Sequence, residues 1–334
     1  MTDAPPNIPS LTDRLRKIDA GAPVVGVHFL GATPVFVLGD EALLFAPKGG
    51  DSVRLPVHGG AILASASDGE RILTGGDDGR LVETSAGRET AEKAADPKKR
   101  WIDQIALGPD GAVAWSAGKT AHVLPGKGEA KTLEAPSTVG GLAFAPKGFR
   151  LAVAHYNGVS LWFPNAAAAA QVLPWKGSHL AVRFSPDGRF VVTAMQESTL
   201  HGWRLADAKD MRMSGYSARV RSFGWTADGA FLATSGSEQL ILWPFEGKDG
   251  PMGKQPAIWA PMQARVVVVA PHPRQAVVAA GYSDGTVLLV RTDDGAEILG
   301  HAPGGSPVSA LGWDAAGRLL GIGCEDGEAG ILAL

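Results

Sequence analysis

Few residues in this 334-residue chain have the types and spacing that could support catalysis. Gly281-Tyr282-Ser283-Asp284-Gly285 matches the pattern G-x-S-x-G, in which a serine on a sharp strand-to-helix turn acts as a nucleophile beside a base. Here the apolar run Val287-Leu288-Leu289-Val290 follows the match, and its residue types predict a strand. We therefore interpret the segment as a turn between two strands and predict no catalytic residue.

A second segment, residues 250–255, resembles a phosphate-binding loop in its glycine and lysine content. The spacing G-x-x-x-x-G-K is absent, and Gln255 stands where a Ser or Thr would bind Mg²⁺. The chain also lacks the patterns H-E-x-x-H and C-x-x-C and the dinucleotide glycine motif. These observations predict no cofactor and a protein that is not an enzyme.

The histidines are the remaining candidates for metal ligands, but no two of them have the spacing of ligands on one helix face. His58, His155 and His301 lie near predicted loops on one face of the fold derived below, which leaves a metal site open as an alternative. We interpret the histidines as turn or strand residues that form hydrogen bonds within the fold, and we predict no metal. They are His28, His58, His122, His155, His179, His201, His272 and His301.

Composition and charge narrow the class of protein. The formal net charge is −3 and the pI is about 6.2, which favour neither nucleic acid nor an anionic membrane as a partner. Cys324 is the one cysteine, which predicts a reducing compartment without disulfides. The first residues lack the apolar core of a signal peptide, and no apolar run approaches the roughly 18 residues of a membrane helix. We expect a cytoplasmic protein.

A repeated unit, best preserved at residues 178–204, organises the chain. Alternating apolar residues lead into the turn Pro186-Asp187-Gly188, a β-branched run follows, and a third apolar segment ends on Trp203. Comparable turns recur at intervals of about 40 residues, which is the period of a four-stranded propeller blade. These marker turns begin at Gly31, Ser67, Pro109, Pro146, Pro186, Ala227, His272 and Ala315.

Other positions repeat with the marker turns. A large apolar residue precedes the turn glycine by four positions in five units and is expected to pack between neighbouring blades: Leu107, Phe144, Phe184, Trp225 and Trp313. Tryptophan recurs on the third strand of three units, at Trp162, Trp203 and Trp243. An acidic residue lies six positions before the third-strand position in four units, where it is expected to accept backbone hydrogen bonds: Asp78, Glu197, Asp284 and Asp326.

These positions resemble the WD-repeat β-propeller family over residues 15–334. The family repeat runs from a Gly-His pair, through a Ser-Pro-Asp-Gly turn and an Asp-containing turn, to a Trp-Asp ending. Ser185-Pro186-Asp187-Gly188 and residues 76–79 and 283–287 are similar to parts of it. No unit has the complete His–Ser/Thr–Asp–Trp set, and Trp243 is followed by Pro244. The resemblance implies an all-β fold, a closed β-propeller of four-stranded antiparallel blades.

The marker turns predict eight blades, with seven, the commoner number in the family, as the alternative. The last unit has three strands before Leu334. Residues 15–24 are similar to residues 130–139, where an outer strand leads into the next blade. We therefore expect an N-terminal strand at residues 14–20 to complete the last blade and remove an open edge. The predicted domains are a flexible N-terminal segment, residues 1–13, and one propeller domain, residues 14–334.

In a propeller, the loops that lead into inner strands share one face with the turns between second and third strands, and residues there can vary without disturbing the core. Arg, Trp and Tyr are the side chains most often found as anchors in interfaces. The partner-binding candidates on this predicted face are Lys98, Lys99, Arg100, Trp101, Tyr156, Gln196, Arg219, Arg265, Tyr282 and Glu325.

We expect a non-enzymatic interaction scaffold that binds a protein or peptide on this face. A rigid fold presents loops with little ordering cost on binding. The basic run at residues 98–100 favours an acidic element on the partner. The alternative is a propeller enzyme or a metal-binding protein that uses residues around the central channel.

Overall fold

The computed structural model describes residues 8–334. These residues form short antiparallel strands joined by tight turns. No α-helix occurs in this range, and the helical elements are two 3₁₀ turns, η1 (Thr12–Arg14) and η2 (Pro109–Gly111). The described chain divides into two compact units. We call them the terminal unit, which comprises the residues up to Val27 and Arg221–Leu334, and the middle unit, His28–Val220.

The middle unit contains a four-stranded sheet for each of the repeats marked by Gly31, Ser67 and Pro109, and one larger sheet. The order β2-β3-β4-β5 forms a four-stranded sheet whose first strand starts in the terminal unit, and β6-β7-β8-β9 and β10-β11-β12-β13 form two more. Their bounds are β2 (Val24–Leu30), β3 (Thr33–Leu38), β4 (Ala42–Phe45), β5 (Val53–Pro56), β6 (Ile62–Ser67), β7 (Arg71–Gly76), β8 (Arg80–Ser85), β9 (Thr90–Ala95), β10 (Ile105–Leu107), β11 (Val113–Ala117), β12 (Thr120–Leu124) and β13 (Lys131–Glu134).

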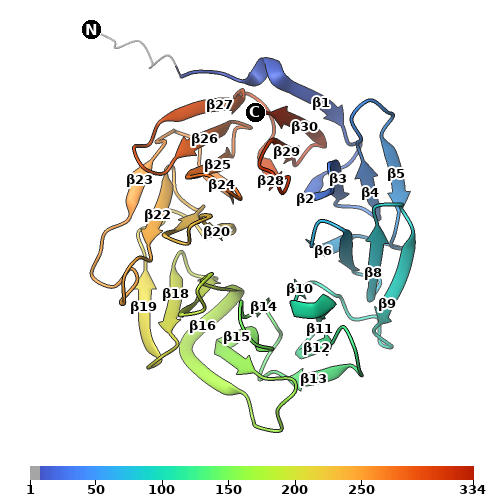
Figure 1. The fold of residues 1–334 in the computed structure, drawn as a ribbon, viewed down its shortest axis with the longest axis vertical. Coiled ribbons are helices and arrows are strands. Elements are labelled where there is room, and N and C mark those ends of the chain that lie inside the picture. Colours follow the sequence, from blue (N-terminus) through green and yellow to red (C-terminus); the bar gives the residue numbers. More distant parts are fainter. Residues whose placement is uncertain (1–7) are drawn as a thin grey trace. The chain divides into compact units, whose positions relative to one another are not determined.

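The larger sheet has six strands in the order β14-β15-β16-β17-β18-β19 (Figure 1, green to yellow). Two of these strands are long, because each pairs with different neighbours along its length. Residues 151–154 of β15 pair with β14 and residues 156–161 pair with β16, which in turn pairs with β17 from His179 to Phe184. The bounds are β14 (Gly141–Phe144), β15 (Leu151–Trp162), β16 (Gln171–Phe184), β17 (Phe190–Met195), β18 (Leu200–Arg204) and β19 (Lys209–Met213).

The terminal unit contains three four-stranded sheets, β20-β21-β22-β23, β24-β25-β26-β27 and β1-β30-β29-β28. Their bounds are β20 (Phe223–Trp225), β21 (Phe231–Thr234), β22 (Leu240–Pro244), β23 (Ala257–Trp259), β24 (Val266–Pro271), β25 (Val277–Tyr282), β26 (Val287–Arg291), β27 (Glu297–His301), β28 (Val308–Trp313), β29 (Leu319–Cys324), β30 (Glu328–Ala333) and β1 (Leu15–Asp19).

The described residues therefore form seven sheets, which agrees with the alternative of seven and not with the prediction of eight separate blades. The difference arises at one place. The repeats marked by Pro146 and Pro186 share the six-stranded sheet, because β16 continues without interruption from its pairing with β15 to its pairing with β17. Marker turns count repeats, and they do not report whether two repeats are joined by hydrogen bonds into one sheet.

The residues near 14–20 form β1, which lies beside β30 (Figure 1). The register runs from Leu15 opposite Leu332 to Asp19 opposite Glu328. Of the segment predicted as flexible, residues 1–7 lie outside the described residues. The following residues lie along β27, where the Leu11 amide donates to the Leu299 carbonyl and the Leu299 amide donates to Pro9, both at 2.8 Å.

The marker turns have the geometry that their residues predict. In the turn after β16, the Asp187 carboxylate accepts hydrogen bonds from the Ser185 hydroxyl at 2.6 Å and from the Arg189 amide at 2.9 Å. Gly188 has a φ of +77°, a left-handed conformation that glycine adopts without steric cost. Such turns reverse the chain within a few residues and allow successive strands to pair.

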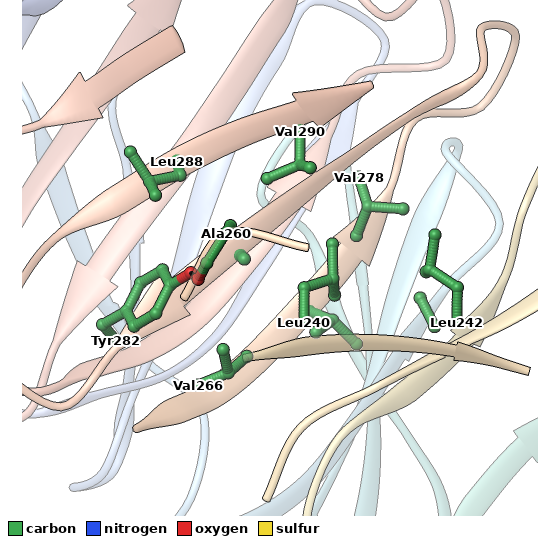
Figure 2. Close-up of a cluster of buried hydrophobic side chains, with 11 residues drawn as sticks. Leu240, Leu242, Ala260, Val266, Val278, Tyr282, Leu288 and Val290 are labelled. Carbon is green, nitrogen blue, oxygen red and sulfur yellow. Dashed lines mark hydrogen bonds between the residues drawn. The ribbon is translucent and has the colours of Figure 1, made fainter. Parts of the chain in front are cut away.

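The core lies between neighbouring sheets. Figure 2 shows one cluster in the terminal unit, where Leu240 and Leu242 of β22 approach Val266 and Val278 of the next sheet. The Tyr282 ring packs beside them, and its side chain has no exposed area. Burying apolar surface of this kind is the main favourable contribution to the stability of such repeats. Within residues 8–334, no helix is long and apolar enough to cross a membrane.

Candidate interaction surface

The turns between second and third strands lie beside the loops that lead into first strands. In the middle unit, the Ile102 amide donates to the Gly76 carbonyl at 3.1 Å, and the Gln196 amide donates to the Ser178 carbonyl at 2.9 Å. The first bond joins the loop before β10 to the end of β7, and the second joins the turn after β17 to β16 just before its pairing with β17. Turns after second strands and segments that lead into first strands therefore occupy the same end of the strands. We call this end the entry face of the middle unit.

The loop from Asp96 to Trp101 is held by one carboxylate. Asp96 accepts hydrogen bonds from the amides of Lys98 at 2.9 Å and Arg100 at 3.1 Å, and its other oxygen accepts two from the Arg100 guanidinium at 3.1 and 2.7 Å. The Asp96 side chain is 4% exposed. The hydrogen bonds from Arg100 hold the pKa of Asp96 at about 2. This network fixes the conformation of the loop. The Arg100 guanidinium is paired with Asp96 and is therefore not a free cation.

Lys98, Lys99 and Trp101 are exposed in this loop, as is Pro97. The Trp101 side chain is 63% exposed, whereas the next residue, Ile102, is fully buried and anchors the loop to the core. Between residues 8 and 334, no carboxylate lies within ion-pair distance of either lysine. The loop thus presents an indole and two unpaired ammonium groups on a rigid support.

Tyr156 is the second exposed aromatic residue on the entry face, with 52% of its area exposed. The Tyr156 amide donates a hydrogen bond at 2.8 Å to the hydroxyl of Ser137, which lies in the loop before β14. The following residue, Asn157, has a φ of +70°, and its side-chain oxygen accepts a hydrogen bond from the Gly177 amide at 3.2 Å. Tyr156 therefore lies at an irregularity in the pairing of β15 with β16, where a hydrogen bond links it to the loop before β14 and another links Asn157 to β16.

Gln196 and Arg219 form a third part of the same face. The Arg219 guanidinium donates to the Gln196 side-chain oxygen at 3.0 Å. Gln196 is exposed and Arg219 is half-buried. The structure thus brings six predicted residues to the entry face of the middle unit, namely Lys98, Lys99, Trp101, Tyr156, Gln196 and Arg219, with Arg100 behind them.

Three predicted residues belong to the terminal unit. Arg265 is exposed, and its guanidinium lies 3.7 Å from the Glu238 carboxylate. Glu325 is exposed at the turn after β29. Tyr282 was expected on the surface but is fully buried, and its hydroxyl donates to the Ala260 carbonyl at 2.7 Å (Figure 2). As the last residue of β25, it points into the core, so it is removed from the candidate binding residues.

The three histidines considered as metal ligands form hydrogen bonds within their own units. His58 contacts the Asp78 carboxylate at 3.0 Å through Nδ1 and the Thr74 hydroxyl at 2.9 Å through Nε2. His155 contacts the Ser160 hydroxyl at 3.0 Å, and His301 contacts the Gly285 carbonyl at 2.7 Å. Among residues 8–334, no group of three His, Cys, Asp or Glu side chains is arranged to hold a metal ion.

The role of Asp96 was not anticipated from the sequence, although a local signal existed. Asp96 precedes Pro97 and Lys98, and an aspartate at the start of such a segment commonly accepts hydrogen bonds from amides two to four residues later. The buried cluster of His179, His201 and Trp175 was also missed. Its residues come from two strands, and no spacing along the chain indicates that they meet.

Comparison with known proteins supports the fold and leaves the family open. No protein-family model matches the chain, and no curated protein matches it. Among solved structures, it is similar to the crystal structure of the computationally designed Ika8 protein, with 16% sequence identity and a TM-score of 0.77. The similarity covers 96% of this chain and 98% of that chain. Together with the succession of four-stranded antiparallel sheets, it defines the protein as a β-propeller.

Proposed function

We propose that the protein is a non-enzymatic scaffold of the WD-repeat type that binds a protein or peptide on the entry face of the middle unit. The observation that supports this most directly is the 63% exposure of Trp101 on a loop fixed by Asp96. A rigid aromatic side chain loses little conformational freedom on binding, and tryptophan is enriched among the residues that dominate binding energy. Tyr156 offers a second aromatic contact on the same face.

The charges near Trp101 favour a partner that carries acidic residues. Lys98 and Lys99 are exposed and unpaired within the described residues, whereas the charge of Arg100 is compensated by Asp96. Acidic residues on the partner would therefore meet two free ammonium groups beside the indole. Complementary charges of this kind mainly raise the association rate and the specificity, and their effect weakens with salt. We infer an acidic segment with an apolar residue that covers Trp101.

The proposal is tested by purifying the tagged chain with its associated proteins from its native lysate. Two variants, Trp101→Ala and the double variant Lys98→Glu/Lys99→Glu, change the surface without touching Asp96 or Arg100. The control is Lys48→Glu, an exposed lysine in the loop between β4 and β5 at the other end of the strands. Proteins retained by wild type and by the control, but reduced about tenfold or more by both variants, are the expected partners. An identical set for all four proteins would reject the entry face as the binding surface.

A further inference from the structure

Arg150 lies in the loop between β14 and β15, at the end of the strands opposite to the entry face. Its guanidinium is 5.6 Å from the centre of the Phe163 ring and 5.3 Å from the centre of the Phe184 ring. These distances are those of cation–π contacts. A guanidinium that rests on aromatic rings keeps its N–H groups directed outward in its own plane, where they can bind the two oxygens of a carboxylate.

No countercharge accompanies this cation. Within residues 8–334, the Arg150 side chain makes neither a hydrogen bond nor an ion pair, and the two aromatic contacts are its interactions. Burial lowers the pKa of Arg150, and no carboxylate acts in the opposite direction. A partly buried guanidinium with five N–H donors and no acceptor is unfavourable, because the aromatic rings do not replace the lost hydrogen bonds to water.

Arg189 provides a comparison in the same unit. Its guanidinium also lies on an aromatic ring, 5.1 Å from the centre of Phe190, but it forms an ion pair with Asp187 at 2.5 Å. The two arginines thus share the aromatic contact and differ in the acidic partner. The missing partner of Arg150 is therefore not a general property of arginines at this end of the strands.

The surface on the Phe163 side of Arg150 is apolar. Phe163 is 47% exposed, whereas Phe184 is 7% exposed and belongs to the core. The chain then forms an exposed turn at residues 166–169, all alanine, in which the Ala166 amide donates to the Phe163 carbonyl at 2.9 Å. On the other side of the loop, Phe149 lines an open hollow of about 810 Å³ whose lining is mixed and includes Asp110, Lys127 and Asn165. A cation without a partner is therefore set in a surface that offers apolar contacts.

We propose that Arg150 and Phe163 form a second docking site, which binds a glutamate or aspartate side chain of a partner peptide together with an apolar neighbour of that residue. The carboxylate accepts two hydrogen bonds from the guanidinium and supplies the missing charge. The apolar neighbour covers the Phe163 ring and the alanine turn. The site shares no residue with the entry face, so it goes beyond the proposed function and can be tested separately.

The test uses the full chain and two blocked peptides, acetyl-Leu-Glu-Leu-amide and acetyl-Leu-Gln-Leu-amide. Arginine side-chain Nε–Hε resonances are recorded by NMR during titration, with assignments from the variants Arg150→Met and Arg189→Met. We expect the Arg150 resonance to shift saturably with the glutamate peptide, with an affinity about tenfold or more above that for the glutamine peptide. Arg150→Met, followed through the backbone amide resonances of residues 145–170, should show no saturable shift, while the matched control Arg189→Met should change the affinity less than about twofold.

Three outcomes would reject this site. The first is equal binding of the glutamine peptide, which would show that the carboxylate is not recognised. The second is the absence of saturation up to about 10 mM of the glutamate peptide. The third is tighter binding of inorganic phosphate than of the peptide, which would assign Arg150 to a phosphate ligand. Circular dichroism of Arg150→Met verifies that a loss of binding is not a loss of folding. Phe163→Ala should weaken binding of the peptide, while the Phe184 ring keeps its contact with the Arg150 guanidinium.

Discussion

At the scale of single residues, His201 has an unusual environment for an ionisable group. Its side chain has no exposed area, and its ring stacks on Trp175 with the ring centres 3.8 Å apart. Neither ring nitrogen makes a hydrogen bond, and the Asp210 carboxylate is 3.6 Å away. Burial lowers the pKa of His201 to about 3, and the charges of His179 and Arg212 act in the same direction. The folded protein therefore holds this histidine neutral.

This environment predicts a loss of stability in acid. The unfolded chain binds a proton to His201 near pH 6.5 and the folded chain near pH 3, so the stabilisation is complete above pH 6.5 and decreases as the pH falls through this window. His201→Phe keeps an aromatic ring against Trp175 and removes the titration. From pH 6.5 to about pH 4.5, the free energy of unfolding of wild type should fall by about 2 kcal/mol more than that of the variant. Urea unfolding at the two pH values measures this, and parallel pH profiles would contradict it.

At the same scale, sequence patterns identified types of residue better than their exposure. The polar turn around Ser283 was recognised, but Tyr282 beside it was placed on the surface. Alternation along a strand decides which side chains point inward, and a shift of one residue reverses every assignment. The β25 strand continues to Tyr282, and the Ala260 carbonyl that accepts its hydroxyl comes from a loop 22 residues earlier. Nothing local in the sequence indicates that contact.

At the scale of elements, the loop at residues 96–101 depends on Asp96. Asp96→Ala leaves the amides of Lys98 and Arg100 without their acceptor and frees the Arg100 guanidinium. Losing an acceptor for several donors costs about 1–3 kcal/mol, so we expect a decrease of this size in the free energy of unfolding. The control is Asp51→Ala, an exposed aspartate in the same unit. Chemical unfolding of both variants measures the difference, and equal stability of the two would show that the carboxylate does not hold the loop.

The sheets were predictable from the sequence to different degrees. Turns such as Pro186-Asp187-Gly188 located the hairpins, since proline, aspartate and glycine each fix a particular backbone geometry. The joining of two repeats into the sheet β14–β19 was not predictable, because it depends on hydrogen bonds of the long strands β15 and β16 with different neighbours. In the candidate surface, the loops were located by the same turn signals. The hydrogen bonds of Tyr156 with Ser137 and of Asn157 with Gly177 could be seen only in the structure.

At the scale of the whole molecule, the two ends of the described chain share one sheet. The strand β1 pairs with β30 over five residue pairs, and Lys17 forms an ion pair with Glu328 at 3.3 Å. This ion pair is exposed and contributes little by itself. The larger effect comes from the strand pairing and from Leu15, which packs against the core cluster beneath β30. The similarity of residues 15–24 to an internal outer strand was sufficient to predict which segment would pair.

This pairing predicts different outcomes for two shortened chains, one starting at Leu15 and one starting at Ala20. The first retains β1 and loses the hydrogen bonds of Leu299 with Leu11 and Pro9, so it should keep the elution volume of the full chain and show a modest decrease in Tm. The second exposes the edge of β30, whose free N–H and C=O groups can pair with another chain. It should therefore show a larger decrease in Tm, together with earlier elution in gel filtration or aggregation on heating. Equal Tm and equal elution volumes for the two chains would mean that β1 contributes nothing to holding the sheet together.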